Sequence, residues 1–227
     1  LGWPVEKIAL NVASEVIKGA TDICSLAGIN ISGGHSVETQ EPIFGLSVSG
    51  LVENAHLKLN NTCRIGDWIY ITKPLGLGLL ANALKMGMLS EDGYTVFLDL
   101  ACSLNSVGMD LGKQTQVTAM TDITGFGLLG HLKEMLCMGL GAELELSQIP
   151  VIEEAKLIAS KMIYPNITTN NYNYIKEMTD GLNGLEFLWL CDPQTSGGLM
   201  FTTSEQVDRP NTWLIGRVTD SGRIQIK

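Results

Sequence analysis

Residues 119–131 constrain this chain more than any other stretch, because they combine a strand end, a carboxylate, two glycines and the start of a helix. The segment reads Ala-Met-Thr-Asp-Ile-Thr-Gly-Phe-Gly-Leu-Leu-Gly-His. Apolar side chains at helical spacing predict an amphipathic helix with Thr124 near its N-cap, and they lie at Leu128, Leu129, Leu132, Met135 and Leu136. Asp122 in front of such a helix either caps free N–H groups or holds a hard cation beside a phosphate. Taken alone, the segment favours capping, since helix starts are far commoner than metal sites.

The composition narrows the class of protein. The 227 residues suffice for one large domain or two smaller ones, and no apolar run approaches the roughly 20 residues of a membrane span. A net charge of −9 with dispersed basic residues argues against nucleic acid. No secretory leader is recognisable at the start, and the five cysteines form no Cys-x-x-Cys. We therefore expect a cytoplasmic protein with free thiols and no membrane or nucleic-acid partner.

The first fifty residues carry one helical pattern followed by two strand patterns. Apolar residues recur every three or four positions over residues 6–27, and Gly28 stands where a helix-ending glycine is expected. Residues 29–32 and 43–52 are predicted to be strands, the second because large and small side chains alternate along it. Residues 53–62 are polar and lack a clear period, so we place a domain boundary there.

The rest of the chain predicts strands and helices in mixed order. Strands are expected at residues 68–72, 117–120, 142–146, 185–190, 199–202, 213–218 and 223–226, the last two as a hairpin around residues 220–222. Residues 73–78 are expected to lead into a helix that ends at about residue 86, and further helices are expected at about 95–113 and at 153–162. Loops are expected at 164–174 and 191–198. Because the elements interleave without a strict strand–helix–strand repeat, we predict an α+β fold with mixed sheets.

Glycine-bearing loops occur at residues 33–36, 122–127 and 192–198. Glycines let backbone N–H groups approach an anion closely, and neighbouring Ser and Thr hydroxyls add donors, which suits phosphates in a lysine-poor chain. None of the three has the Walker pattern or the Gly-x-Gly-x-x-Gly pattern of dinucleotide-binding folds. Singly, each loop is better explained as a tight turn.

The histidines and nearby carboxylates have structural explanations that compete with functional ones. His35, between a glycine pair and a serine, is expected to be exposed, and a turn residue explains it as well as a ligand contact does. Glu38 and Glu41 beside it are better explained as a solvated loop than as ligands. His131 is expected on the surface of its helix, and His56 in solvent. No catalytic Ser-His-Asp or Cys-His arrangement is recognisable by spacing.

Taken together, five segments resemble selenophosphate synthetase, also called selenide, water dikinase, a family of the aminoimidazole ribonucleotide synthetase superfamily. They come in the family's order and read Leu-Gly-Trp-Pro at 1–4, Gly-Gly-His-Ser-Val-Glu-Thr-Gln-Glu-Pro-Ile-Phe-Gly-Leu at 33–46, Thr-Lys-Pro-Leu-Gly at 72–76, Met-Thr-Asp-Ile-Thr-Gly-Phe-Gly-Leu-Leu-Gly-His-Leu at 120–132, and Leu-Cys-Asp-Pro-Gln-Thr-Ser-Gly-Gly-Leu at 190–199. The segment at 33–46 is specific to this family within its superfamily. The match is weak over residues 152–185 and 203–211.

The resemblance implies an ATP-dependent phosphotransferase that makes selenophosphate from ATP, selenide and water and releases AMP and phosphate, with Mg²⁺. It also implies a homodimer that forms through a β-barrel in an N-terminal α/β domain, followed by an α+β C-terminal domain. On this basis residues 1–55 are expected to be the tail of the N-terminal ATP-binding and dimerisation domain. Residues 63–227 are expected to be the complete C-terminal domain with its mixed sheet.

The resemblance assigns few site residues. Asp122 matches the family's metal-binding aspartate of the C-terminal domain, and Gly33, Gly34 and His35 match a loop that contacts ATP bound mainly by the partner subunit. The family's catalytic Cys or selenocysteine, its neighbouring Lys and its other metal aspartates match no residue here, so no catalytic residue is assigned. Because one aspartate holds Mg²⁺ poorly and the chain opens without methionine, we expect a piece of a longer protein that is inactive alone.

Two other interpretations stay open. The chain can belong to another ATP-dependent enzyme of the same superfamily, and a thermal-shift screen of substrates would separate that case from selenophosphate synthesis. It can also be a non-catalytic dimerisation or scaffold fragment. Phosphoryl transfer depends mainly on positioning and charge neutralisation. Carboxylates and glycine loops are therefore expected both in a selenophosphate synthetase and in another ATP-dependent enzyme of the superfamily.

Overall fold

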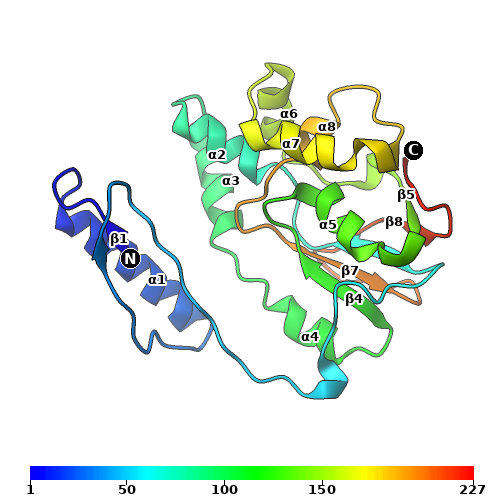
Figure 1. Ribbon diagram of the computed structural model, residues 1–227, viewed down its shortest axis with the longest axis horizontal. Helices are drawn as coiled ribbons and strands as arrows, with labels where there is room; N and C mark the ends of the chain where they lie inside the picture. The colour runs from blue at the N-terminus through cyan, green and yellow to red at the C-terminus, as the bar shows by residue number, and fades with distance from the viewer. The chain divides into compact units, whose positions relative to one another are not determined.

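Two units make up the chain in the computed structural model, Leu1–Glu53 and Asn54–Lys227 (Figure 1). The structure describes residues 1–227 apart from the side chain of Met138. In this described part no helix is both long and apolar enough to cross a membrane. Each unit has its own internal packing and is described by itself.

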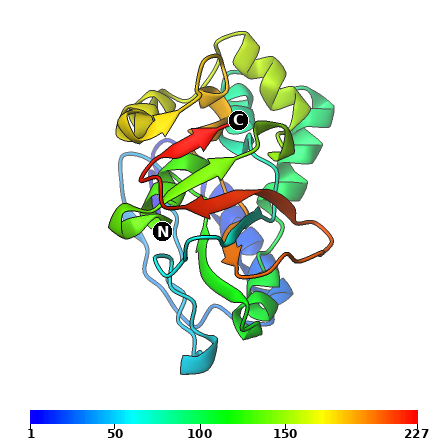
Figure 2. The same cartoon turned by 90° about the vertical axis from the view of Figure 1, so that its right-hand side faces the viewer.

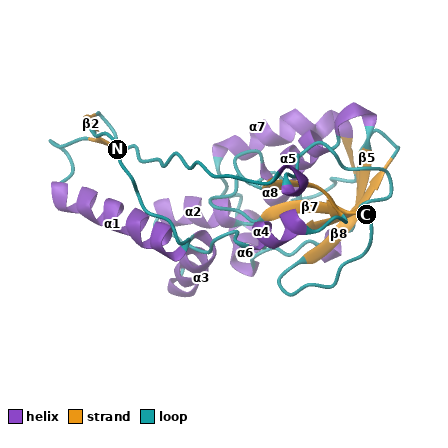
Figure 3. Cartoon of the chain, turned by 90° about the horizontal axis from the view of Figure 1, so that it is seen from below, coloured by secondary structure: helices purple, strands orange, loops and turns teal.

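The first unit consists of helix α1 (Leu10–Leu26), two short strands and long loops (Figure 3). Strands β1 (Gly2–Trp3) and β2 (Val37–Glu38) pair in parallel. Helix α1 confirms the predicted helix, and Gly28 follows it with a φ of 73°, the left-handed conformation that ends helices.

The predicted strands at 29–32 and 43–52 do not form. Only Ile43 makes a bridge, to Gly2, and the residues after it run as irregular chain with exposed apolar side chains, among them Leu46 and Val48. A strand needs a neighbouring strand to bind its backbone N–H and C=O groups. Within the described residues of this unit, none lies along 44–52. The alternating pattern of residues 43–52 is typical of a strand, but the described residues of the first unit provide no neighbouring strand with which this segment could pair.

A mixed seven-stranded sheet forms the centre of the second unit and confirms the predicted α+β class. Its order is β4–β7–β3–β8–β5–β9–β6, with β3 (Trp68–Ile71), β4 (Val117–Asp122), β5 (Gly141–Leu144), β6 (Thr179–Asp180), β7 (Leu199–Thr203), β8 (Trp213–Thr219) and β9 (Ile224–Ile226). Neighbours from β4 to β5 are antiparallel, whereas β9 runs parallel to both β5 and β6. The sheet thus places the end of β4 at one edge, directly beside β7.

Helices cover both faces of this sheet. They are α2 (Leu77–Lys85), α3 (Glu91–Ala101), α4 (Val107–Lys113), α5 (Gly127–Met135), α6 (Glu153–Ser160), α7 (Asn166–Ile175) and α8 (Phe187–Leu190), with 3₁₀ turns η1 (Asn54–His56), η2 (Cys137–Gly139), η3 (Leu146–Gln148) and η4 (Lys176–Met178). Helices α5, α7 and α8 lie on one side of the sheet and α4 on the other (Figure 1). Side chains alternate accordingly along β3, since Ile69 and Ile71 join the main core under α5, whereas Tyr70 stacks on Phe201 and packs with Leu111 of α4.

The predicted hairpin of the last two strands is wrong. Strand β5 lies between β8 and β9, antiparallel to the first and parallel to the second (Figure 2). The turn at 220–222 passes over Gly141, where a Cβ would overlap Ser221 and Arg223, so only glycine fits beneath it. A turn does form at residues 220–222, as predicted, but it connects two strands that are separated in the sheet by β5.

Three helical segments also differ from the prediction. The expected helix at 95–113 is two helices, α3 and α4, which are separated by residues 102–106. The expected loop at 164–174 is helix α7, whose buried face consists of Thr168, Asn171 and Ile175. These positions have helical spacing, but two of them are polar, and a search for apolar periodicity misses them. The expected strand at 185–190 is the short helix α8, because a brief apolar run fits either structure.

Candidate functional site

Two of the three glycine-bearing loops meet where β4 ends. We name residues 122–127 the aspartate loop and residues 192–198 the proline loop. The N–H of Ile123 donates to the carbonyl of Gly198 at 2.8 Å, and a Cβ at Gly197 would overlap the carbonyl of Ile123. The glycine therefore allows the backbones of the two loops to pack directly against each other.

Asp122 is the last residue of β4 and lies exposed opposite Leu199 of β7. Its carboxylate has no hydrogen bond or ion pair within the part of the chain that the structure describes. Helix α5 begins only at Gly127, with Phe126 at its N-cap, so neither Asp122 nor Thr124 caps it. The capping role favoured by the segment alone is therefore wrong, and the carboxylate is free to meet a ligand.

His131 is buried, with 7% of its surface exposed, which corrects its expected place on the helix surface. Its Nε2 lies 3.2 Å from the hydroxyl of Thr124, and the edge of its ring meets the ring of Phe126 at 5.8 Å between centroids. Glu134 lies 3.3 Å from Nδ1, but the pair lacks hydrogen-bond geometry. The carbonyl of Thr124 in turn accepts from the N–H of Gln194 at 2.9 Å. His131 thus packs against the aspartate loop and fixes the side chain of Thr124 through this hydrogen bond.

Asn171 of α7 joins the two loops from the other side. The side chain is only 4% exposed, and its Nδ2 donates to the carbonyls of Gly125 at 2.8 Å and Cys191 at 3.0 Å. Both carbonyls lie in irregular backbone that would otherwise leave them unpaired, and a buried unpaired carbonyl is costly. Helix α7 therefore fixes the distance between the aspartate loop and the start of the proline loop.

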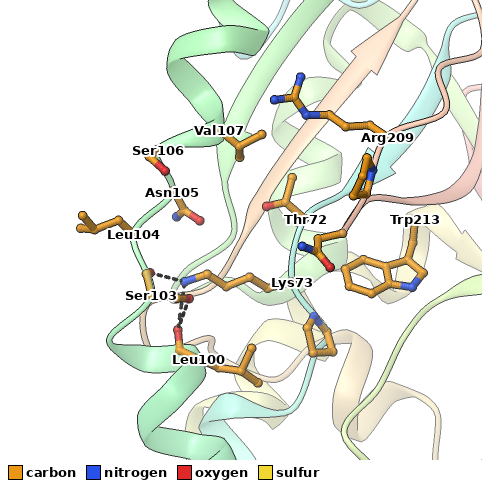
Figure 4. A pocket seen from close by; sticks show the side chains of 13 residues that line it. Thr72, Lys73, Leu100, Ser103, Leu104, Asn105, Ser106, Val107, Arg209 and Trp213 are labelled. Atoms are coloured by element: carbon orange, nitrogen blue, oxygen red, sulfur yellow. Dashed lines mark hydrogen bonds between the residues drawn. The ribbon is translucent and has the colours of Figure 1, made fainter. Parts of the chain in front are cut away.

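Lys73, directly after β3, binds the proline loop to the α3–α4 connection. Its ammonium group donates to the carbonyls of Leu100 at 3.0 Å and Ser103 at 2.8 Å (Figure 4). It also donates to the carbonyl of Ser196 at 2.9 Å. Three donors thus meet three acceptors, and two of these are carbonyls at the end of α3 and just beyond it. This accounts for the break between α3 and α4, because the chain turns there to present its carbonyls to Lys73.

Side chains of the proline loop cap helix α2. Gln194 Oε1 accepts from the N–H groups of residues 76 and 77 at 3.1 and 3.2 Å, and Asp192 Oδ2 accepts from those of residues 78 and 79 at 2.9 and 3.1 Å. These are the donors that a helix start leaves unpaired and that a bound phosphate would need. Here the protein itself occupies them, so the proline loop acts as a structural turn at α2.

Asp192 carries out this capping in a fully buried position. Burial raises the pKa of its carboxyl to about 8, and hydrogen bonds from the N–H of Leu79, the side chain of Gln194 and the N–H of Gly78 partly oppose the rise. Its other oxygen, Oδ1, has no partner within the described residues. Asp192 is therefore a titratable group whose charge bears on folding.

Three cysteines of the second unit, Cys63, Cys137 and Cys191, are placed as structural thiols. Burial raises the pKa of Cys63 to about 11 and that of Cys191 to about 12, which disfavours the nucleophilic thiolate. Cys63 donates to the carbonyl of Met135, and Cys137 to that of Asn61. All five cysteines of the chain are free.

The third loop belongs to the first unit. Gly33 and Gly34 have open space where a side chain would lie, and His35 is exposed. With Cys24 and residues 44–49, among others, they line a hollow of about 660 Å³. The backbone N–H groups of Gly33 and Gly34 donate no hydrogen bond within the described residues, so they are available to a ligand.

The donor set for a metal is sparse. Among the described residues, no group of three or more His, Cys, Asp or Glu side chains lies close enough to hold a metal ion. Asp122 offers the hard oxygen ligand that Mg²⁺ prefers, and Mg²⁺ commonly takes one or two carboxylates together with substrate phosphates. The residues present thus fit one protein ligand of such a site.

Sequence reasoning missed three residues that shape the site. Lys73 stands in a segment quoted for the resemblance, and a lysine between a strand and a proline was a signal for a fixed role. His131 gave a partial signal through its place among buried leucines. Asn171 gave none, because it lies in an Asn- and Thr-rich stretch without apolar periodicity.

Comparisons with known proteins identify the family of the chain. Residues 64–227 match the family described as AIR synthase related protein, C-terminal domain. The chain is 42% identical over 202 residues to a selenide, water dikinase of Photorhabdus laumondii, covering 88% of this chain and 58% of that protein. It is 43% identical over 207 residues to that of Pseudomonas aeruginosa, covering 91% and 60%. The chain thus spans about 60% of the length of these relatives.

Solved structures share the fold at low identity. Escherichia coli HypE, a hydrogenase maturation protein, matches with a TM-score of 0.69 and 17% identity, covering 97% of this chain and 66% of that one. Thiamine monophosphate kinase of Aquifex aeolicus matches with 0.66 and 16%, covering 98% and 70%. At such identities the likeness concerns the fold alone.

Asp192→Asn should change how stability depends on pH. An unfolded Asp192 releases its proton near pH 3.8, whereas the folded one holds it to about 8. Between these values the folded state binds more protons, so the contribution of Asp192 to stability is full below about pH 4 and is lost as pH rises towards 8. The asparagine keeps an oxygen acceptor for α2 and has no such titration. Melting temperatures measured from pH 5 to 8 should therefore fall in the original chain relative to the variant.

Asp99→Asn serves as the control, because Asp99 is exposed on α3 and its variant should follow the original chain. Parallel melting curves for the original chain and Asp192→Asn over this pH range would contradict the raised pKa.

Proposed function

We propose that this chain, which belongs to the family of AIR synthase related proteins through residues 64–227, is part of an enzyme that makes selenophosphate from ATP, selenide and water. AMP and phosphate are the other products. The observation that carries the proposal is 40–43% identity over most of the chain to proteins named selenide, water dikinase. The free thiols fit a cytoplasmic enzyme.

Asp122 is the proposed magnesium ligand of the second unit. Mg²⁺, when bound, would neutralise charge on the phosphates that are transferred. The chain's own part is to aim the carboxylate. Pairing of β4 with β7 fixes the backbone of Asp122, and the contacts of His131 and Asn171 hold the loop that follows it. The backbone that carries the carboxylate is therefore already ordered before a ligand binds.

Gly33, Gly34 and His35 are the proposed ATP contacts of the first unit. The N–H groups of both glycines have no acceptor within the described residues and are free for phosphate oxygens, and the adjoining hollow of about 660 Å³ is large enough for a nucleotide. In this proposal residues 1–55 are the tail of an ATP-binding and dimerisation domain, and residues 63–227 are the C-terminal domain.

The test of the proposed function measures AMP formed from ATP with and without selenide. The natural polypeptide that carries these residues should form AMP only when selenide is present. The 227 residues alone should form none, because no residue among them matches the family's nucleophile. Formation of ADP from ATP when thiamine phosphate is supplied, or formation of AMP that does not depend on selenide, would favour another enzyme of the superfamily and contradict the proposal.

Asp122→Asn should abolish the magnesium-dependent activity of the natural polypeptide and leave its fold intact. The asparagine has the same size and lacks the charge that a metal requires. We expect AMP formation to fall by more than about 100-fold, since even the outer partners of a metal site commonly cost 10- to 100-fold. Asp99→Asn, the same change at an exposed position of α3, should keep full activity. A normally active Asp122→Asn enzyme would refute the metal assignment.

A second copy of the chain is the proposed partner of the first unit. Apolar side chains of residues 43–52 are exposed to an extent unusual for one short stretch, and they are Ile43, Phe44, Leu46, Val48, Leu51 and Val52. Their backbone runs as irregular chain without a partner strand in this unit. A segment with strand-forming composition and unpaired backbone recruits another chain. We therefore propose a homodimer through residues about 29–52, in which this stretch completes a shared sheet.

Leu46→Asp should weaken this association. A carboxylate at position 46 would enter an apolar interface unpaired, which costs several kcal/mol. Sedimentation of the original chain at tens of micromolar should show a dimer or larger assembly, and the variant should shift towards monomer. Leu157→Asp, at an exposed position of α6, is the matched control and should leave the assembly unchanged. A clean monomer for the original chain would rule out the homodimer.

A further inference from the structure

A cleft in the second unit lies apart from the carboxylate of Asp122 and has no role in the function proposed above. It has a volume of about 490 Å³ and is lined by the end of β3, the α3–α4 connection and the segment that leads into β8 (Figure 4). Asp122 is not among its lining residues. A volume of this size is typical of sites for small organic ligands.

We propose that this cleft binds a small planar organic anion. The first argument is the charge of Lys73, which lies in its wall and is only 6% exposed. No carboxylate within the described residues lies within ion-pair distance of it, and its three protons go to backbone carbonyls. A buried charge without a counter-charge is costly, and an anion in the cleft would offset that cost.

The surroundings of Lys73 point the same way. Burial lowers the pKa of the ammonium group, so its charged form gains from any nearby negative charge. The titratable neighbour that acts on it is the thiol of Cys102. Arg209, also in the lining, is already paired with Asp110 at 3.1 Å. Lys73 therefore contributes one positive charge without a carboxylate partner to the wall of the cleft, and a ligand with one acidic group would balance it at longer range than a hydrogen bond.

The mouth of the cleft supplies free donors and an aromatic face. Ser106, Asn211 and Trp213 are among its lining residues, and the hydroxyl of Ser106 and the amide of Asn211 have no hydrogen-bond partner within the described residues. Trp213 is half-buried and offers a ring on which a planar group can stack. Together these features suit a ring with an acidic substituent better than a bare inorganic anion.

Backbone conformation marks the same place. Asn211 has a φ of 55° and Ser196, whose carbonyl binds Lys73, a φ of 54°. Left-handed conformations are strained for residues other than glycine and persist where the surrounding structure demands them. Asn211 lines the cleft, and Ser196 is joined to it through the hydrogen bond from Lys73.

The test uses benzoate as the probe and benzamide as its neutral match. In ¹⁵N-labelled chain the four tryptophans give four indole N–H signals, and Trp213→Phe identifies that of Trp213. Benzoate should shift the Trp213 signal saturably at millimolar concentration, leave those of Trp3, Trp68 and Trp189 in place, and bind at least tenfold more tightly than benzamide. Ser106→Ala should weaken benzoate several-fold, and Ser147→Ala, at an exposed position of η3, should not.

Three results would overturn the proposal. The first is no saturable shift of the Trp213 signal up to about 20 mM benzoate, a concentration well above a millimolar Kd. The second is equal affinity for benzoate and benzamide, which would remove the role of charge. The third is equal shifts of all four indole signals, which would show unspecific binding. If Trp213→Phe fails to fold, the effect of Ser106→Ala against Ser147→Ala still locates the site.

Discussion

Four backbone N–H groups at the start of helix α2 donate to two side chains of a distant loop, and the arrangement of the site depends on this contact. Gln194 binds the first two and Asp192 the last two. Gly78 allows the approach, because a Cβ there would overlap the carbonyl of Pro193. The contact fixes the proline loop, and with it the backbone against which the aspartate loop packs. A helix cap supplied from more than a hundred residues away thus sets local geometry and long-range order together.

This contact also separates the structural from the chemical parts of the loops. In the proline loop the side chains of Asp192 and Gln194 bind α2, and the carbonyl of Ser196 accepts from Lys73, so these groups have structural roles. The aspartate loop is the reverse. Its backbone is held by Gly198, Gln194 and Asn171, whereas the carboxylate of Asp122 makes no hydrogen bond or ion pair with the described residues. Constraint on the backbone and freedom of one side chain is the arrangement expected of a group that meets substrate.

How much of this was predictable follows from the kind of signal each element carries. Helix α1 followed from apolar periodicity, which reports directly on a buried face, and the α+β class followed from the mixed order of strands and helices. Helix α7 did not, because Thr168 and Asn171 face the interior as polar residues whose burial depends on partners elsewhere in the chain. The order of β5, β8 and β9 is likewise a tertiary property, since a turn signal does not say what lies between its two strands.

The site shows the same division. The sequence pointed to Asp122 and to the glycine loops through their local pattern, and its resemblance to selenide, water dikinases agrees with the relatives found. The roles of Lys73, His131 and Asn171 could not be read from local pattern. Each acts through contacts to carbonyls or hydroxyls that are distant or unremarkable in sequence. Apolar periodicity and short motifs do not indicate which side chains hydrogen-bond to the backbone groups of loops.

Amide hydrogen exchange at the start of α2 tests the central contact most directly. First-turn amides of a helix exchange rapidly when only water binds them, because they have no partner within the helix. Those of residues 76–79 should instead be strongly protected, and Gln194→Ala should release residues 76 and 77 while residues 78 and 79 stay protected by Asp192. Rapid exchange of all four in the original chain would show that the cap, and the loop geometry built on it, does not exist in solution.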